Sequence, residues 1–240
     1  MRTSVHRGVG ASVVGGAIVA AVALGAPGSV AAQADQVFTI QGGWFLVEGE
    51  DARSDGDVLY QNLSVFAFEI DDFNGGTIGA EWALGLGNFF EAGVGASYYQ
   101  RSVDSVYWDL IDEDGTEIVQ EMKLRMAPIA VTARVFPLGR RIPVQPYVGG
   151  GLAMIPWRYS ESGEFVDADD LIFQATYKDS GWAFGPVVYG GVRFAGDIFF
   201  GGAEFRYHNA TGDLDPAIEF FGDEIDLGAY QWLFTFGWRF

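Results

Sequence analysis

Apolar and polar residues alternate along most of the chain after residue 35. Because successive side chains of a strand point to opposite faces, this alternation predicts strands that are apolar on one face only. Tight turns or longer polar stretches separate the alternating segments. The pattern predicts eight strands, near 37–47, 76–86, 90–101, 122–136, 145–158, 181–194, 198–209 and 228–240.

The last predicted strand shows the alternation in its purest form. Its aromatic residues occupy every second position: Tyr230, Trp232, Phe234, Phe236, Trp238 and Phe240. A transmembrane barrel strand suits this pattern, because its lipid-facing residues alternate with interior ones and its aromatics gather at the membrane interfaces. The alternative is an ordinary strand of a soluble sandwich. The carboxylate after Phe240 favours the membrane strand, because a free carboxylate is hard to bury in a core.

Short and long connections alternate between the predicted strands. The short ones are 87–89, 137–144 and 195–197, and the long ones are about 48–75, 102–121, 159–180 and 211–226. Outer-membrane barrels have this outline, with short periplasmic turns and long extracellular loops. We therefore predict an all-β fold, an eight-stranded antiparallel up-and-down transmembrane β-barrel with both mature termini in the periplasm.

Residues 1–34 have the layout of a secretory signal peptide. Arg2 and Arg7 precede an uncharged run, and Ala32-Gln33-Ala34 offers a small-x-small cleavage site. The run is also long enough for a transmembrane anchor. Its many Gly and Ala residues and the Ala-x-Ala exit favour cleavage instead, which leaves residues 35–240 as the barrel domain.

The mature chain is strongly acidic, and its acids are sorted along the sequence. Without Arg2 and Arg7, 12 Lys and Arg residues remain against 32 Asp and Glu, a formal charge of 12 − 32 = −20. Such a balance argues against nucleic acid or anionic membrane surfaces as partners. Of the 32 acids, 27 fall in the four long connections, where only Arg53 and Lys178 are basic. We therefore expect four acidic extracellular loops above an apolar band.

A few charged residues occupy the strands, on the face opposite the apolar one. An Arg facing lipid at the bilayer midplane costs about 2–4 kcal/mol, so these side chains are expected inside the barrel. Eight strands enclose barely enough room for their own side chains, so the interior charges should pair with one another rather than line a pore. The predicted lumen ion-pair network consists of Glu81, Arg134, Arg193, Glu204, Arg206 and Arg239. A gate built from the same ions is the alternative.

Two segments leave alternatives open. Lys123 and Arg125 share the parity of Ile129, which faces lipid in this scheme. Either Pro128 marks a bulge that resets the alternation, or both cations lie above the bilayer, where lipopolysaccharide phosphates would bind them. The segment 65–68 suits either a loop helix or a strand extension.

Residues that carry catalysis or bind metals are scarce. The chain contains no cysteine, which excludes thiolate catalysis and Cys-based metal sites. His208 is the one histidine after residue 34, so a two-histidine metal site is excluded as well. Asp167, Asp169 and Asp170 cluster in a long connection without the spacing of a Ca²⁺-binding helix–loop–helix. We expect no cofactor, no metal and no enzymatic activity.

The mature chain resembles small eight-stranded outer-membrane β-barrel proteins. The resemblance rests on the Ala-x-Ala exit, the alternating strands, the three short turns and the stretch Val144-Gln-Pro-Tyr-Val-Gly-Gly-Gly151. The alternating aromatics that end in Phe240 also resemble the terminal signal read by the barrel-assembly machinery. The resemblance implies a monomer in the outer membrane of a Gram-negative-type bacterium, in contact with outer-membrane lipids and lipopolysaccharide.

The resemblance specifies architecture better than function. The family includes adhesion proteins, envelope-stabilising proteins, channels for small solutes and a few lipid-modifying enzymes. We expect a non-enzymatic structural or surface-interaction role, and the alternative is a narrow channel or conduit for small hydrophobic solutes. Lipid A modification is least favoured: the segment around His208 is similar to the catalytic strand of lipid A deacylases, but Ala210 stands where those enzymes have the serine.

Overall fold

The computed structural model describes residues 35–112, 114–167 and 171–240. The predicted signal peptide lies outside the described residues, as do Asp169 and Asp170 of the acidic cluster. All described residues belong to one unit of the chain, Gln33–Phe240. Within them, no helix is long and apolar enough to cross a membrane.

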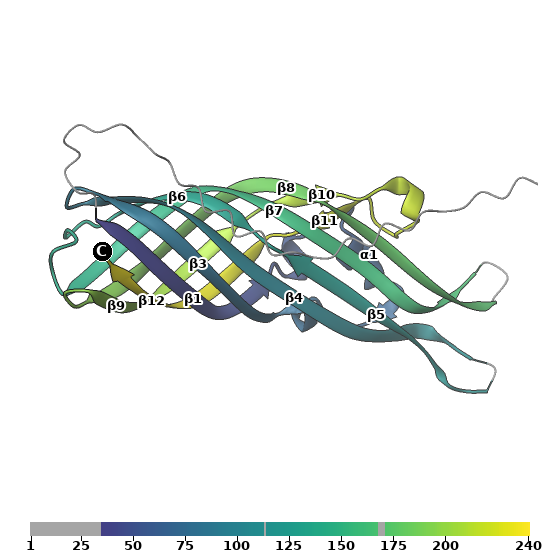
Figure 1. The fold of residues 1–240 in the computed structure, drawn as a ribbon. Helices are drawn as coiled ribbons and strands as arrows, with labels where there is room; N and C mark the ends of the chain where they lie inside the picture. The colour runs from purple at the N-terminus through teal and green to yellow at the C-terminus, as the bar shows by residue number, and fades with distance from the viewer. Residues whose placement is uncertain (1–34, 113, 168–170) are drawn as a thin grey trace, which may run out of the picture. The chain divides into compact units, whose positions relative to one another are not determined.

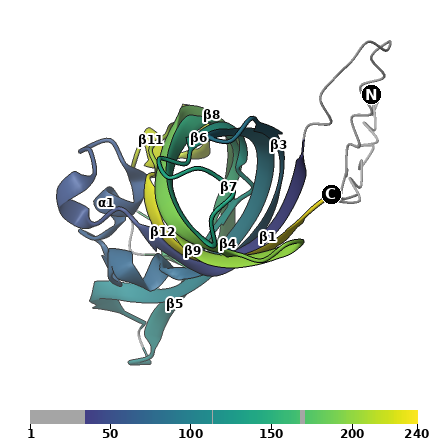
Figure 2. The same ribbon diagram turned by 90° about the vertical axis from the view of Figure 1, so that its left-hand side faces the viewer.

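Eight antiparallel strands follow one another around a closed ring (Figures 1 and 2). They are β1 (Gln36–Val47), β3 (Gly75–Leu86), β4 (Phe90–Ile111), β5 (Glu117–Met126) with β6 (Ile129–Val135), β7 (Val144–Val166), β8 (Ile172–Ala195), β9 (Phe199–His208) and β12 (Ala229–Arg239). β5 and β6 form one ring strand in two parts, because both pair with β4 on one side and with β7 on the other. The predicted up-and-down barrel and its eight strands are confirmed.

The ring closes where the first strand meets the last. β1 pairs with β12 from Val37 opposite Arg239 to Val47 opposite Ala229. Two further backbone hydrogen bonds join Gln36 and Phe240, at 2.9 and 3.0 Å. Closure matters because an open sheet edge would leave unpaired backbone groups, which a bilayer does not tolerate.

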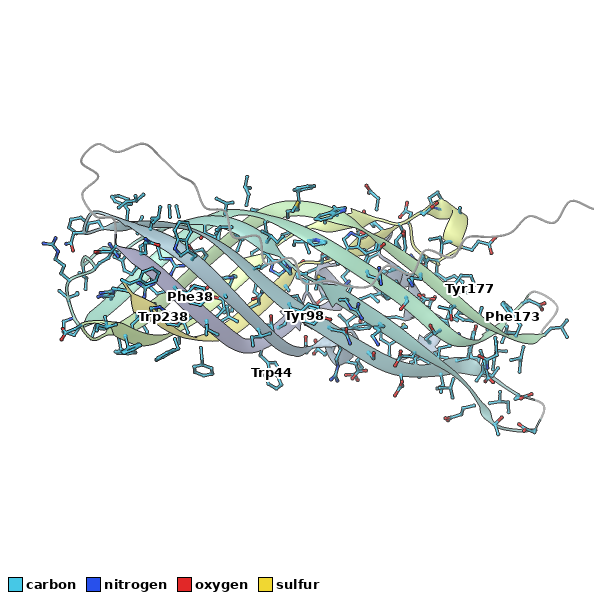
Figure 3. The ribbon with its side chains drawn as sticks, in the orientation of Figure 1. Phe38, Trp44, Tyr98, Phe173, Tyr177 and Trp238 are labelled. Carbon is cyan, nitrogen blue, oxygen red and sulfur yellow. The ribbon has the colours of Figure 1, made fainter. Side chains whose placement is uncertain are left out.

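Side chains alternate between the interior and the exterior of the ring, as the sequence pattern predicts. On β12, Leu233 is 3% exposed and its neighbour Phe234 is 77% exposed. Trp44 of β1 points away from the barrel wall, whereas Phe38 lies beside Trp238 with ring centroids 4.8 Å apart (Figure 3). Over the part of the ring nearest the short turns, the exterior is therefore the apolar surface, and charged strand residues such as Glu91 and Arg193 are inside.

Two of the predicted long loops are wrong in extent. β4 continues to Ile111 and β5 begins at Glu117, and likewise β7 continues to Val166 and β8 begins at Ile172. The physical reason is that most inward residues of these extensions remain apolar or buried, while most of the outward ones are polar. The segments 102–121 and 159–180 therefore have the composition of loops, although most of their residues continue the strands.

The other two long connections fold into short elements at the same end of the barrel (Figure 1). The first contains η1 (Glu50–Ala52), α1 (Val58–Asn62), β2 (Phe66–Ala67) and η2 (Ile70–Phe73), and the last contains β10 (Thr211–Asp213), η3 (Pro216–Ile218) and β11 (Glu224–Asp226). β2 pairs with β4, so the ambiguous segment 65–68 adds a short strand rather than a helix.

Pro128 does not reset the alternation. The two residues between β5 and β6, Ala127 and Pro128, face two residues on each neighbouring strand, so no extra residue is inserted. Burial alternates without a break from Met122 to Ala130. The bulge alternative is therefore wrong, and Lys123 and Arg125 face outward.

We expect the closing seam to be sensitive to a single methyl group at Gly43. A Cβ at this position would lie 1.9 Å from the carbonyl oxygen of Trp232, whereas a Cβ at Gly42 would meet no atom closer than 3.7 Å. Gly43→Ala should destabilise the barrel by about 1–3 kcal/mol, because the strands must separate to accept it. Chemical unfolding in lipid vesicles measures the difference. The matched Gly42→Ala variant should unfold like the native protein, and equal effects of the two substitutions would contradict the seam geometry.

Candidate functional site in the barrel interior

The strand register brings the interior charges together. Glu91 of β4 lies directly opposite Arg134 of β6, and Arg193 of β8 lies opposite Gln145 of β7. Arg206 of β9 has Gln231 of β12 as its register partner. Because inward residues of neighbouring strands meet at matching heights, four segments of the wall contribute charged side chains to one polar layer.

Glu91 is the centre of this layer. Its carboxylate is 1% exposed and accepts hydrogen bonds from Arg193 at 2.9 and 3.2 Å and from Arg140 Nε at 2.8 Å. Arg134 Nε lies 3.8 Å from its other oxygen. One buried carboxylate thus contacts three guanidinium groups, and a carboxylate so surrounded is strongly held by charge-assisted hydrogen bonds.

A second carboxylate, that of Glu81, also contacts Arg134. Arg134 forms an ion pair with Glu81, whose other carboxylate oxygen accepts from the Thr132 hydroxyl at 3.4 Å. The Arg134 guanidinium also lies between two tyrosine rings, 5.2 Å from the centroid of Tyr147 and 5.3 Å from that of Tyr189. Contacts of this kind add cation–π attraction to the ion pairs.

Glu204 and Arg206 complete the polar layer. Arg206 Nη2 lies 2.6 Å from Glu204 Oε1 and donates to the Gln41 side chain at 3.2 Å. The Tyr147 hydroxyl donates to the second oxygen of Glu204 at 2.9 Å. Every carboxylate oxygen of Glu204 therefore has a donor, as a buried carboxylate requires.

The structure brings together five of the six residues predicted for the lumen network, all except Arg239. Arg239 donates to Gln145 Oε1 at 2.7 Å, and among the described residues no carboxylate oxygen lies within 4.0 Å of it. It therefore anchors the last strand through an amide rather than through an ion pair.

Sequence reasoning missed Glu91 and Arg140. Arg140 comes from the turn between β6 and β7, folds back into the interior, and is 4% exposed. It also donates to the carbonyl oxygen of Gly87 in the preceding turn at 3.0 Å. The parity of Glu91, which lies between the outward Phe90 and the half-buried Ala92, was the one available signal for an inward charge.

The other half of the interior is apolar and filled by the first and last loops. Buried residues of these loops pack against inward residues of the extended strands in one hydrophobic cluster. From the loops this apolar plug includes Val58, Leu59, Phe66, Phe73, Ile225 and Leu227, and from the wall Phe45, Met122, Leu124, Met126 and Ile155. The barrel interior therefore has two layers, an ionic one and an apolar one.

The first loop contains a buried ion pair, whose carboxylate also accepts a hydrogen bond from the last loop. Arg53 Nη1 lies 2.7 Å from the carboxylate of Asp57, and both side chains are fully buried. Asp57 also caps α1 by accepting from the Tyr60 amide at 3.0 Å, and it accepts from the Asp226 amide at 2.7 Å. Burial raises the pKa of Asp57, although Arg53 and these hydrogen bonds act in the opposite direction.

A second buried carboxyl holds α1 against the wall. Glu161, in the part of β7 beyond the apolar band, accepts from Asn62 at 2.7 Å and from the Tyr159 hydroxyl at 2.8 Å. It is 3% exposed, and burial raises its pKa against the opposing effect of the two hydrogen bonds. No ion pair is recorded for Glu161 among the described residues, so the plug contains a carboxyl without a cationic partner.

His208 lies between the two layers. It is 2% exposed, its Nδ1 is 3.2 Å from Gln231 Nε2, and its ring is 5.6 Å from that of Phe45. Beside it is a cavity of about 20 Å³, also lined by Arg206, Gly95 and Pro128, which is large enough for one water molecule. No serine hydroxyl is recorded as a partner of His208 in the described part of the chain, so its surroundings are those of a packed interior residue.

Metal-binding geometry is absent from the described residues. No group of three or more His, Asp or Glu side chains there is arranged to hold a metal ion.

The aromatic residues of the last strand lie on the outer face. Tyr230, Trp232, Phe234, Phe236 and Phe240 are exposed, and Trp238 is half-buried against Phe38. The neighbouring strand β9 contributes further exposed aromatics: Phe205 stacks on Tyr230, and Phe199 stacks on Phe236. The outer surface of β9 and β12 is thus almost entirely aromatic.

No protein-family model matches the chain, and no curated protein matches its sequence. Comparison of structures finds neisserial surface protein A, at 12% identity and a TM-score of 0.49 over 86% of this chain and 97% of that one. A second similar structure is that of OprG from Pseudomonas aeruginosa, with 12% identity and a TM-score of 0.48 over 85% of this chain and 95% of that one. A third is outer membrane protein W of E. coli, with 14% identity and a TM-score of 0.45 over 88% of this chain and 100% of that one. These neighbours are outer-membrane barrels, the class that the sequence resembles. The fold assignment rests on the strand pairing of this chain itself.

Removing the charge of Glu91 should destabilise the barrel strongly. Glu91→Gln keeps the size of the side chain but leaves three arginines around a neutral amide, and breaking a buried pair on one side typically costs about 3–5 kcal/mol. Urea unfolding followed by tryptophan fluorescence in lipid vesicles measures the loss. Glu117→Gln is the control, because Glu117 is exposed at the start of β5. A Glu91→Gln variant as stable as the control would contradict the central role of Glu91.

The plug should become more stable as the pH falls through the raised pKa of Glu161. A carboxyl whose pKa is higher in the folded than in the unfolded protein binds its proton more tightly when folded, so its burial is most favourable at low pH and becomes costly as the pH rises. Hydrogen exchange of the α1 amides, corrected for intrinsic rates, should therefore slow as the pH is lowered from 8 to just above the ordinary pKa of a glutamate carboxyl.

Glu161→Gln isolates this effect. The amide is neutral at every pH, so the variant should show little of the pH dependence and should protect α1 at pH 8 better than the native carboxylate does. The same pH dependence in both proteins would assign the effect to another group, such as Asp57.

Proposed function

We propose that this protein is a bacterial outer-membrane barrel with a structural or surface-interaction role and without enzymatic activity. The observation that carries the proposal is the outer face of the ring, where exposed apolar and aromatic side chains form a continuous band around a closed antiparallel sheet. Monomeric soluble proteins rarely expose apolar patches larger than a few hundred Å². A band of this kind suits the hydrocarbon layer of a membrane, with aromatic side chains at its edges.

The interior supports a closed barrel rather than a channel. The ionic layer around Glu91 and the apolar plug follow one another along the interior, and water would have to disrupt both in order to pass. The conduit for small hydrophobic solutes is less favoured for the same reason, because the apolar half of the interior is filled by loop side chains.

The short turns and the long loops lie at opposite ends of the barrel, which defines its orientation in the membrane. With the short turns in the periplasm, the plug and the extended strands lie outside the cell, and the exposed acids of the first loop form part of the outer surface: Glu50, Asp51, Asp55, Glu69, Asp71 and Asp72. Asp57 and Glu48 of the same loop are buried and do not contribute to that surface. An acidic, folded outer surface suits contact with cationic partners.

The proposal extends to the surroundings and the biogenesis of the protein. Outer-membrane lipids and lipopolysaccharide surround the band, the protein is a monomer, and residues 1–34 direct secretion. The alternating aromatics from Tyr230 to Phe240 serve both as a lipid-facing girdle and as the segment that the barrel-assembly machinery reads.

Planar-bilayer recording tests the closed interior. The native protein should insert without producing stable conductance steps, because ion pairs and the plug occupy the lumen. Glu91→Gln supplies a sensitive comparison, since loss of its charge should loosen the ionic layer and produce fluctuating current. Steady conductance of the native protein would favour the channel instead, and extraction from cells without detergent would contradict the membrane location.

A further inference from the structure

Four cations of the outward face lie together beyond one side of the apolar band. Lys123 and Arg125 come from β5, Arg158 from β7 and Lys178 from β8. The register places Arg125 opposite Arg158, while Ser160 lies between Lys123 on one strand and Lys178 on the other. These four residues, here called the cation patch, are one third of the 12 basic residues of the mature chain.

The cation patch contains no carboxylate. Its two rows across the sheet read Gln100, Arg125, Arg158, Ser180 and Ser102, Lys123, Ser160, Lys178. Among the described residues, no carboxylate oxygen lies within 4.0 Å of any of the four cations. The next row beyond carries Asp104 and Glu121, which limits the patch on that side. In a chain with 32 acids, such a surface is a marked departure from the average charge.

The geometry of the cation patch calls for an anion. Arg125 and Arg158 are directly opposite on neighbouring strands, and like charges in that position are destabilising unless a counter-charge lies between them. Arg125 Nε donates to Gln100 Oε1 at 3.0 Å, and within the described residues its terminal nitrogens have no side-chain partner. Guanidinium groups with free donors are well suited to phosphate oxygens.

The position of the cation patch along the barrel axis matches that expected for lipid headgroups. Tyr98 and Trp182 are exposed on the outer face just before the two rows, and the Tyr98 hydroxyl donates to Gln100 at 2.8 Å. Aromatic residues of this kind mark the interface of a transmembrane barrel, so the cations lie where headgroups begin. Phe173 and Tyr177 lie farther along β8, well beyond Trp44 of the band (Figure 3).

We propose that the cation patch binds a glycolipid with more than one phosphate group in the outer leaflet, an inference that rests on the proposed membrane location. Strand spacing puts the four backbone positions within roughly 10 by 7 Å. One phosphodiester headgroup would balance only one of four charges, whereas two phosphate monoesters on a sugar backbone carry enough charge and span such an area. The patch occupies one sector of the barrel, so the lipid binds on the side of β5, β7 and β8.

Binding of diphosphoryl lipid A tests the proposal. The native protein, reconstituted in phosphatidylcholine nanodiscs, is titrated with this lipid and separately with phosphatidylglycerol. Arg125→Gln with Arg158→Gln should weaken binding of the diphosphoryl lipid by about 30-fold, since each basic residue near an anionic surface contributes roughly a factor of five. Arg141→Gln is the control, because Arg141 is exposed in the turn at the opposite end of the barrel.

The possible outcomes separate the two proposals. Equal affinity of the double variant and the native protein would overturn the cation patch alone, provided that both insert and unfold alike. Equally tight binding of phosphatidylglycerol would overturn the requirement for several phosphates. Failure of the native protein to insert into nanodiscs would contradict the membrane location and the patch together.

Discussion

The pairing of buried charges inside a narrow closed ring is the constraint on which the rest of the structure depends. Eight strands leave room for side chains but little for water, so each interior charge needs a protein partner. Glu91 satisfies this requirement for Arg134, Arg140 and Arg193 at once, although these side chains come from different strands and from a turn. Because the charges are satisfied inside, the opposite face of every strand is free to be apolar.

The same alternation continues beyond the apolar band and gives the barrel its second layer. In the extended strands most inward residues are apolar and most outward ones are polar, so the loops cover a largely apolar inner surface. The Arg53–Asp57 pair and the contacts of Asn62 with Tyr159 and Glu161 then fix the loops in place. The ionic layer and the plug lie one after the other along the interior, and the proposal of a structural role is based on this arrangement.

Period-two alternation was sufficient to predict the strands, their faces and most of the interior charges. The alternation does not predict features that depend on contacts with neighbouring segments, such as the ends of the extended strands. The sequence pattern predicts loops at the extensions of β4, β5, β7 and β8 because most of their outward residues are polar, and it does not reveal Arg140 because turn residues have no parity. The plug depends on contacts between segments far apart in sequence, such as that of Asn62 with Glu161, which no local pattern encodes.

Site-directed spin labelling of the last strand tests the membrane-spanning barrel most directly, since the chain has no native cysteine. Labels are placed one at a time at Leu233, Phe234, Thr235 and Phe236 in protein reconstituted in lipid vesicles, and their accessibility to dissolved oxygen is measured. High accessibility at Phe234 and Phe236, with low accessibility at Leu233 and Thr235, is the predicted result. Uniformly low accessibility at all four positions would place the aromatic face in a protein core and contradict the account.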